Sequence, residues 1–265
     1  MNLKQTLAGI TLALAVSGTT VAQASETLRN FHINTAGTGF VGSTLVNDFI
    51  DLTGSAFVHN TFTSASEFDF NEAARFIELT ADGETLLDPF LRATFTGTGT
   101  GSTSTQVLSF TPGGTLTLAT EDSTPFATFT LSEGSANLAA NSTLPQGTVS
   151  LIFTSASLQP GYFFLANGTD LSTVANANLL FGFSTTNALA AANGTRVSSS
   201  LISLYNSAFS PDVTAPIFTN GTTDVQFSTN GQFRIGAVPV PAAFWLLGSG
   251  LAGLMTLAKR KKLAA

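Results

Sequence analysis

The stretch Leu91-Arg92-Ala93-Thr94-Phe95-Thr96 alternates apolar and polar side chains with a period of two. Successive side chains of a β-strand point to opposite faces of a sheet, so this period predicts a strand with one buried face. The same alternation recurs on both sides, for example in residues 56–62 and 126–131. Many such runs, separated by turn residues at short spacing, predict an all-β body of β-sandwich or jelly-roll type.

Four local patterns predict particular connections within this body. Asn230-Gly231 lies between two strand-like runs and predicts a tight hairpin, because both residues tolerate positive φ. Pro112-Gly113-Gly114 predicts another hairpin turn. The run Leu201-Ile202-Ser203-Leu204-Tyr205 is interpreted as a strand. The patch 96–105, rich in Gly, Thr and Ser, predicts a mobile loop.

The N-terminus has the pattern of a secretory signal peptide over residues 1–24. Lys4 supplies a positive charge, residues 7–16 form an apolar run, and Ala22-Gln23-Ala24 places small side chains before a cut. The apolar run is too short to span a bilayer comfortably. We expect signal peptidase to cleave after Ala24.

The C-terminus predicts a transmembrane helix. Residues 242–258 carry no charge, and as a helix they would be about 25 Å long, enough for a bilayer core. A basic cluster follows, formed by Lys259, Arg260, Lys261 and Lys262. Such a cluster stays in the cytoplasm, so the body is expected on the outer side of the membrane. A plain tail anchor and a processed tail both agree with this topology.

The residues before this helix resemble the PEP-CTERM sorting signal. The motif consists of Val238, Pro239, Val240, Pro241 and Ala242. Together with Trp245-Leu246-Leu247-Gly248 it is similar to the VPLPAA-type variant, although Val240 stands where the family has its name-giving glutamate. The resemblance implies that an exosortase, a membrane-embedded cysteine transpeptidase-like enzyme, recognises the prolines and removes the helix. The expected organisation is a signal peptide at 1–24, a body at 25–237 and a sorting tail at 238–265.

Charge is segregated between the body and the ends. Residues 25–237 hold five arginines, no lysine and all sixteen acidic residues, a net charge of −11. A nucleic-acid-binding protein needs a basic surface, so nucleic acid is excluded as a partner. The chain has no cysteine, which excludes disulfides, thiol catalysis and thiolate metal sites.

Enzymatic activity is not expected. His32 and His59 are the only histidines, and the body contains no G-x-S-x-G motif. No cofactor is expected either. Oxygen-rich groups such as Asp82, Glu84 and Asp88 are weak candidates for Ca²⁺, as are Asp48 with Asp51 and Glu67 with Asp69 and Glu72. A solvated acidic loop is the simpler interpretation of each group.

Polysaccharide binding is the main alternative to a purely structural role. Aromatic sugar-binding platforms use Trp or Tyr, and the body offers only Tyr162 and Tyr205.

The body is also faintly similar to flocculation-associated PEP-CTERM proteins. The residues that carry this similarity are Asn30-Phe31-His32-Ile33-Asn34, Gly161-Tyr162-Phe163-Phe164 with Asp170-Leu171-Ser172 after it, and Asn230-Gly231-Gln232-Phe233-Arg234. This implies an exported surface or matrix protein, transiently anchored in the inner membrane, that holds cells and exopolysaccharide together in flocs or biofilm. A polysaccharide-binding module is the second hypothesis and a matrix-acting hydrolase the third.

Overall fold

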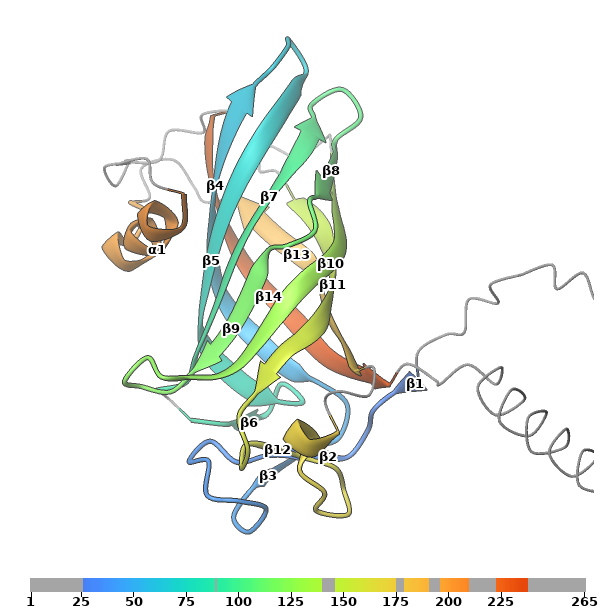
Figure 1. Ribbon diagram of the computed structural model, residues 1–265. Coiled ribbons are helices and arrows are strands. Elements are labelled where there is room, and N and C mark those ends of the chain that lie inside the picture. Colours follow the sequence, from blue (N-terminus) through green and yellow to red (C-terminus); the bar gives the residue numbers. More distant parts are fainter. Residues whose placement is uncertain are drawn as a thin grey trace, which may run out of the picture.

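The computed structural model describes residues 26–88, 90–139, 146–174, 179–190, 196–209 and 223–237. In this part of the chain strands dominate, joined by one α-helix and one short 3₁₀-helix, so the predicted all-β class is confirmed. Figure 1 shows long strands that wrap around a common axis. The molecule is a barrel rather than a stack of two layers.

The barrel wall is an antiparallel meander of eight strands. They are β4 (Ile50–Phe62), β5 (Glu67–Ala81), β7 (Arg92–Ser102), an interrupted strand made of β8 (Val107–Phe110) and β9 (Thr115–Ala119), β10 (Pro125–Ala139), β11 (Gln146–Leu158), β13 (Leu179–Ala190) and β14 (Asp224–Ala237). Each strand pairs with its neighbour in the chain, and β14 pairs with β4 to close the sheet.

The closure corrects the predicted β-sandwich or jelly roll. The alternation of apolar and polar side chains indicates only that each strand has one buried face. This is equally true of a sandwich and of a barrel. The deciding contact is the pairing of the last strand with the first wall strand, for instance Phe233 opposite Ile50. These residues are far apart in the sequence, and no local sequence pattern predicts their pairing.

One end of the barrel is capped by a small second sheet, visible below the barrel in Figure 1. It consists of β2 (Phe31–Ile33), β3 (Thr44–Val46) and β12 (Phe163–Phe164), followed by the 3₁₀-helix η1 (Leu171–Thr173). Phe31, Ile33 and Phe163 are fully buried and join the barrel core. We call this end the capped end and the opposite one, where β4 ends and β5 begins, the far end. The two-residue strand β6 (Thr85–Leu86) pairs antiparallel with the end of β5 at the capped end.

Helix α1 (Ser199–Phe209) packs on the outer face of β4 and β5 (Figure 1). The prediction of a strand at 201–205 is therefore wrong. Leu201, Ile202 and Tyr205 are buried, and their spacing places them on one face of a helix. The backbone N–H of Leu201 donates to Oγ of Ser198, a typical start for a helix. This face contacts Phe57 and forms a second, separate apolar cluster.

Two predicted irregular segments are continuous strand. The Asn230-Gly231 hairpin is wrong, because β14 runs straight through it and pairs with β4 on one side. Gly231 faces the Phe183 ring so closely that a side chain would collide with it. Most of the predicted loop 96–105 is β7, whose glycines face inward beneath phenylalanine rings. Close packing against aromatic rings, not turn formation, explains the glycines at these positions.

The predicted hairpin at Pro112-Gly113-Gly114 is wrong as well. Strands β8 and β9 both lie between β7 and β10, and both run antiparallel to these neighbours. The segment between them is thus an interruption of one wall strand.

The described body starts and ends at the same place. Strand β1 (Glu26–Thr27) pairs with the end of β14, with Glu26 opposite Ala237. The predicted signal peptide (1–24) and sorting tail (238–265), including its transmembrane helix, lie outside the described residues. Within the described ranges, no helix has the length and apolar character needed to cross a membrane.

Candidate functional site

The interior of the barrel contains an apolar cavity of about 60 Å³. All eight wall strands contribute side chains to it. The lining residues are Ala56, Val58, Glu72, Ala74, Phe76, Phe95, Leu108, Phe110, Leu116, Ala136, Val149, Leu151, Phe153, Phe183, Phe227 and Thr229. Its lining, which is mainly apolar with few polar groups, is of the kind found in small-molecule sites, although such sites usually have a volume of about 300–1,000 Å³.

Glu72 is the one ionisable side chain in this lining. Alternation along β5 places it on the inner face with Phe68, Phe70 and Phe76. Burial raises the pKa of the Glu72 carboxyl to about 7. Within the part of the chain that the structure describes, this carboxyl has no hydrogen-bond or ion-pair partner.

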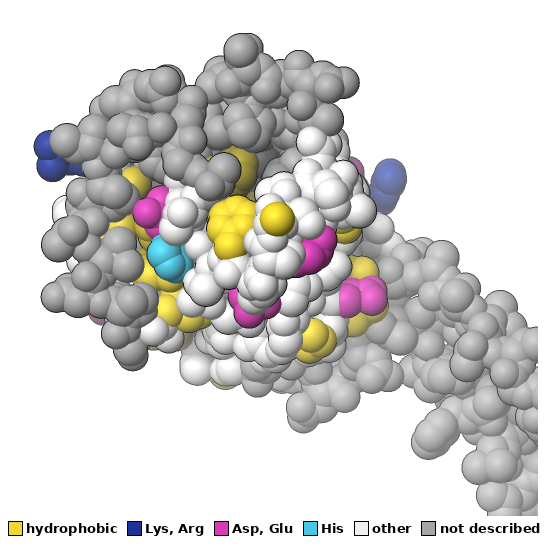
Figure 2. All heavy atoms as spheres, turned by 90° about the horizontal axis from the view of Figure 1, so that it is seen from above, with side chains coloured by type: hydrophobic (Ala, Val, Ile, Leu, Met, Phe, Trp, Pro, Cys, Tyr) yellow, Lys and Arg dark blue, Asp and Glu magenta, His cyan; other side chains and the backbone are white. Residues whose placement is uncertain are grey.

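Figure 2 looks onto the far end of the barrel and shows hydrophobic side chains at the surface among polar ones. The large apolar residues that are partly exposed at this end include Phe62 and Val107, at 38% and 39% of their surface. Phe62 packs against Phe68, with 5.4 Å between ring centroids. The far end therefore offers apolar surface above the cavity.

The outer wall over β7 to β11 carries rows of hydroxyl groups that lie in register across the strands. The first row is Thr94, Thr117, Thr128 and Ser157; the second is Thr96, Thr115, Thr130 and Thr154; the third is Thr100, Ser109, Ser135 and Ser150. These side chains are partly or fully exposed. We call this surface the hydroxyl face.

The hydroxyl face is almost uncharged. Within strands β7 to β11 only Arg92 and Glu133 carry a charge. Neighbouring strands lie about 4.8 Å apart, so each row presents hydroxyls at a regular short spacing. Because each hydroxyl both donates and accepts, the face can hydrogen-bond to another hydroxyl-rich surface.

The two histidines lie apart in the fold. Nδ1 of His59 is 2.7 Å from Oδ1 of Asp224, which lies opposite it on β14. Nδ1 of His32 is 3.1 Å from Oγ of Ser43, whose hydroxyl donates to the carbonyl of Phe40. Among the described residues, neither histidine has both a hydroxyl nucleophile and a carboxylate as partners. The contacts of both are those of structural side chains.

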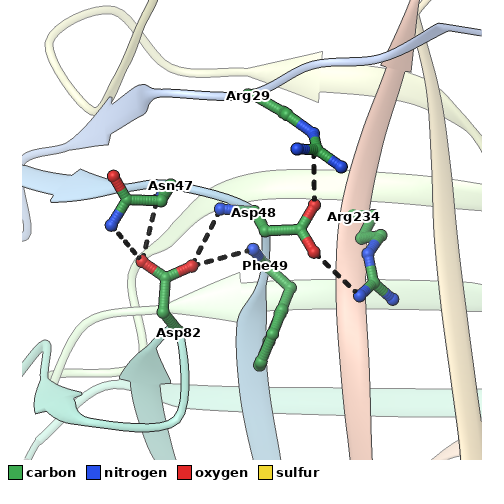
Figure 3. A network of polar contacts seen from close by, with 6 residues as sticks. All are labelled: Arg29, Asn47, Asp48, Phe49, Asp82 and Arg234. Carbon is green, nitrogen blue, oxygen red and sulfur yellow. Dashed lines mark hydrogen bonds and ion pairs between the residues drawn. The ribbon is translucent and has the colours of Figure 1, made fainter.

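Asp82, the first of the weak calcium candidates, clamps a loop in the structure (Figure 3). Its carboxylate accepts the backbone N–H groups of Asn47 (2.8 Å), Asp48 (2.8 Å) and Phe49 (3.2 Å), and the side-chain amide of Asn47 (2.9 Å). Burial raises the pKa of Asp82, but these hydrogen bonds outweigh it, so the pKa lies below its ordinary value.

The other acidic candidates do not gather around Asp82. Glu84 is exposed, and Oδ1 of Asp88 accepts the N–H of Phe90. Asp48 pairs with Arg234 at 3.1 Å, as Figure 3 shows, and Arg29 lies 3.9 Å away. In the described ranges no three His, Asp or Glu side chains come close enough to hold a metal ion. Calcium binding stays a prediction.

The tyrosines predicted as a sugar-binding platform are engaged in packing. Tyr205 is fully buried beneath α1, edge-on to Phe57. Tyr162 is half-buried and stacks on Phe126, with 4.5 Å between ring centroids. Neither presents an open ring face, so a polysaccharide would have to contact polar side chains instead. The predicted sorting motif 238–242, the basic cluster 259–262 and the cleavage residues Ala22 and Ala24 lie outside the described residues.

Comparison with known proteins adds no relative. No family model, curated protein or solved structure matches the chain. Its function is therefore argued from its own residues. Two features were missed in the sequence: the hydroxyl face, which depends on the register of five strands, and Glu72 as a lumen residue. Alternation could have identified Glu72, since it shares parity with three phenylalanines of β5.

Proposed function

We propose that this chain is an exported adhesive protein of an exopolysaccharide matrix, and that the hydroxyl face is its contact surface. The observation that carries the proposal is the register of three hydroxyl rows on one nearly uncharged wall. A polysaccharide presents hydroxyls at short, repeating intervals, so many weak hydrogen bonds can form along both surfaces. Many such contacts together give a high affinity, because each hydrogen bond that forms holds the next pair of hydroxyl groups close to one another.

The acidic body favours this class of partner over a nucleic acid. Its net charge of −11 repels phosphate backbones, while a neutral polysaccharide is indifferent to charge. The proposal involves no catalytic step, since the described contacts of His32 and His59 are structural.

Export and sorting form the second part of the proposal. Signal peptidase would remove residues 1–24, and an exosortase would act at Pro239 and Pro241, leaving the protein at the cell surface or in the matrix. Both cuts lie outside the described strands, which run from Glu26 to Ala237. Both processing segments would then leave a folded body intact.

Adhesion is tested by binding of the secreted protein to exopolysaccharide purified from the same cells, measured by co-sedimentation. Thr115→Val with Thr130→Val removes two facing hydroxyls and keeps the shape of both side chains. A hydrogen bond contributes about 1 kcal/mol, so the loss of two should weaken binding by about 30-fold. Thr53→Val with Thr80→Val, on the wall formed by β4 and β5, is the matched control. Equal binding by both double variants would remove the hydroxyl face from the proposal.

Sorting is tested by the intact mass and location of the protein in cells with and without the exosortase. We expect the mature mass to lack the tail only when the exosortase and both prolines are present. A tail that remains attached to a membrane-bound protein in every strain would contradict sorting and leave a plain anchored surface protein.

A further inference from the structure

The cavity in the barrel is a second feature with binding chemistry, and it is independent of the hydroxyl face. Its volume of about 60 Å³ exceeds the 10–15 Å³ that one water molecule requires. It is smaller than the cavity of about 150 Å³ that holds benzene in a well-studied engineered protein. A compact ligand with few heavy atoms therefore fits, and a long acyl chain does not.

The carboxyl of Glu72 faces this cavity without a partner. Val58 on β4 and Gly97 on β7 lie opposite it in the sheet. Gly97 has no side chain, and the ring of Phe95, which also lines the cavity, occupies the space in front of it. An ionised carboxylate in such surroundings is costly unless a charge or a donor compensates it. The site thus lacks one cationic or hydrogen-bond-donating group.

The other residues that line the cavity indicate which kind of ligand group would compensate the Glu72 carboxylate. Apart from the hydroxyl of Thr229, the other lining residues are apolar, and none carries a positive charge. An anionic ligand would meet a carboxyl and no counter-charge. A cation gains an ion pair with Glu72 and is also attracted by aromatic faces, which Phe76, Phe95 and Phe110 supply here. The acidic body further raises the local concentration of cations.

We propose that the barrel interior binds a small alkylamine in its ammonium form, with the ammonium on the Glu72 carboxylate and the alkyl group among the phenylalanines. The cavity volume limits the alkyl group to a short chain. The amine would enter from the far end, where Phe62 and Val107 expose apolar surface. The capped end is filled by Phe31, Ile33 and Phe163.

The experiment is an NMR titration of the secreted protein at pH 8 with ethylamine, ethanol and acetate as separate probes. We expect saturable shifts of lumen resonances, such as those of Ala74 and Ala136, with ethylamine. At least tenfold weaker binding is expected for ethanol and for acetate. Equal binding of ethanol and ethylamine would overturn the proposal in favour of a merely apolar cavity, and the absence of binding by ethylamine would also overturn it.

Glu72→Gln tests the role of the carboxyl. This variant should lose ethylamine binding by at least tenfold and keep its weak response to ethanol, whereas Glu133→Gln on the outer wall should behave as the parent. Retained amine binding by Glu72→Gln would overturn the proposal. A second measurement needs no variant: the NMR titration of the Glu72 carboxyl carbon should move to lower pH when ethylamine is present. An unchanged titration would equally overturn it.

Discussion

Phe70 on β5 lies directly opposite Gly99 on β7, and its ring covers the position that a side chain on the glycine would take. A Cβ atom built on Gly99 would be 2.5 Å from Cζ of Phe70 and would also press on the carbonyl oxygen of Ser109. Gly101 has the same relation to Phe68. The inner wall is thus packed by phenylalanine rings of one strand lying over glycines of the next.

Gly99→Ala should therefore destabilise the protein. Overpacking in a filled interior costs about 1–3 kcal/mol, and here a backbone oxygen must move as well as a ring. Urea unfolding at pH 7 measures the loss. Gly182→Ala is the control: Gly182 also lies within a strand, and a Cβ there would meet nothing within 4 Å. If both variants lost equal stability, the glycines would matter for backbone freedom and not for packing.

Replacement of Asp82 should loosen the loop that it clamps. Asp82→Ala removes the acceptor of four hydrogen bonds and places alanine at a φ of 54°, so we expect a loss of about 2 kcal/mol. Asp82→Asn tolerates that φ and keeps one acceptor oxygen, so its loss should be smaller.

The pH dependence of stability distinguishes the effect of the Asp82 charge from the effect of its backbone geometry. Its pKa is lowered in the folded protein, so its contribution to stability is present above the ordinary pKa of 3.8 and is lost as the pH falls through the folded value. Both variants should lose less stability on acidification than the parent does. A parent-like decrease of stability in either variant at low pH would assign the acid sensitivity to other carboxylates.

Glu72→Gln should change the pH dependence in the opposite direction. The folded pKa of about 7 lies above the ordinary 4.5, so the folded state holds its proton longer than the unfolded state. Parent stability should fall as the pH rises from about 4.5 to 7, by roughly 3 kcal/mol, and then level off. The variant, which has no charge at this position, should lack this decrease and be more stable than the parent at pH 8. Denaturant unfolding at several pH values, with Glu133→Gln as the control, checks this.

Helix α1 should detach without unfolding the barrel. Tyr205 is the largest side chain of the small cluster between the helix and the outer wall, which is separate from the barrel core. Tyr205→Ala should accelerate hydrogen exchange at residues 199–209 while the wall strands stay protected. Ser203→Ala, at an exposed position of the same helix, should leave exchange unchanged. Accelerated exchange throughout the wall strands would show that the two clusters unfold together.

Alternation along the chain identified most wall strands and the face that each buries, because burial on one side of a strand is a local property. It also explains Glu72 in retrospect, since this residue shares its face with Phe70 and Ala74. The helix was mistaken for a strand because its short apolar run is compatible with both structures. Only the spacing of Leu201, Ile202 and Tyr205 distinguishes them.

The remaining errors have one physical origin. Whether a glycine forms a turn or lies within a strand depends on its tertiary contacts. Asn230-Gly231 forms turns where the chain must reverse, but Gly231 lies under the ring of Phe183 in a continuous strand. The register that builds the hydroxyl face and the closure between β14 and β4 also depend on residues distant in sequence. None of these partners is visible in a local window.

The pairing of Glu26 with Ala237 makes the two ends of the barrel unequal, because both ends of the described chain lie at one of them. Both ends of the described body meet at the edge that carries the capping sheet, as Figure 1 shows. If the chain were attached to a surface through the residues that follow Ala237, the capped end of the barrel would therefore lie next to that surface. The rim at the far end would point outward into the medium, and the hydroxyl rows would face sideways, toward neighbouring molecules at the same height above the surface.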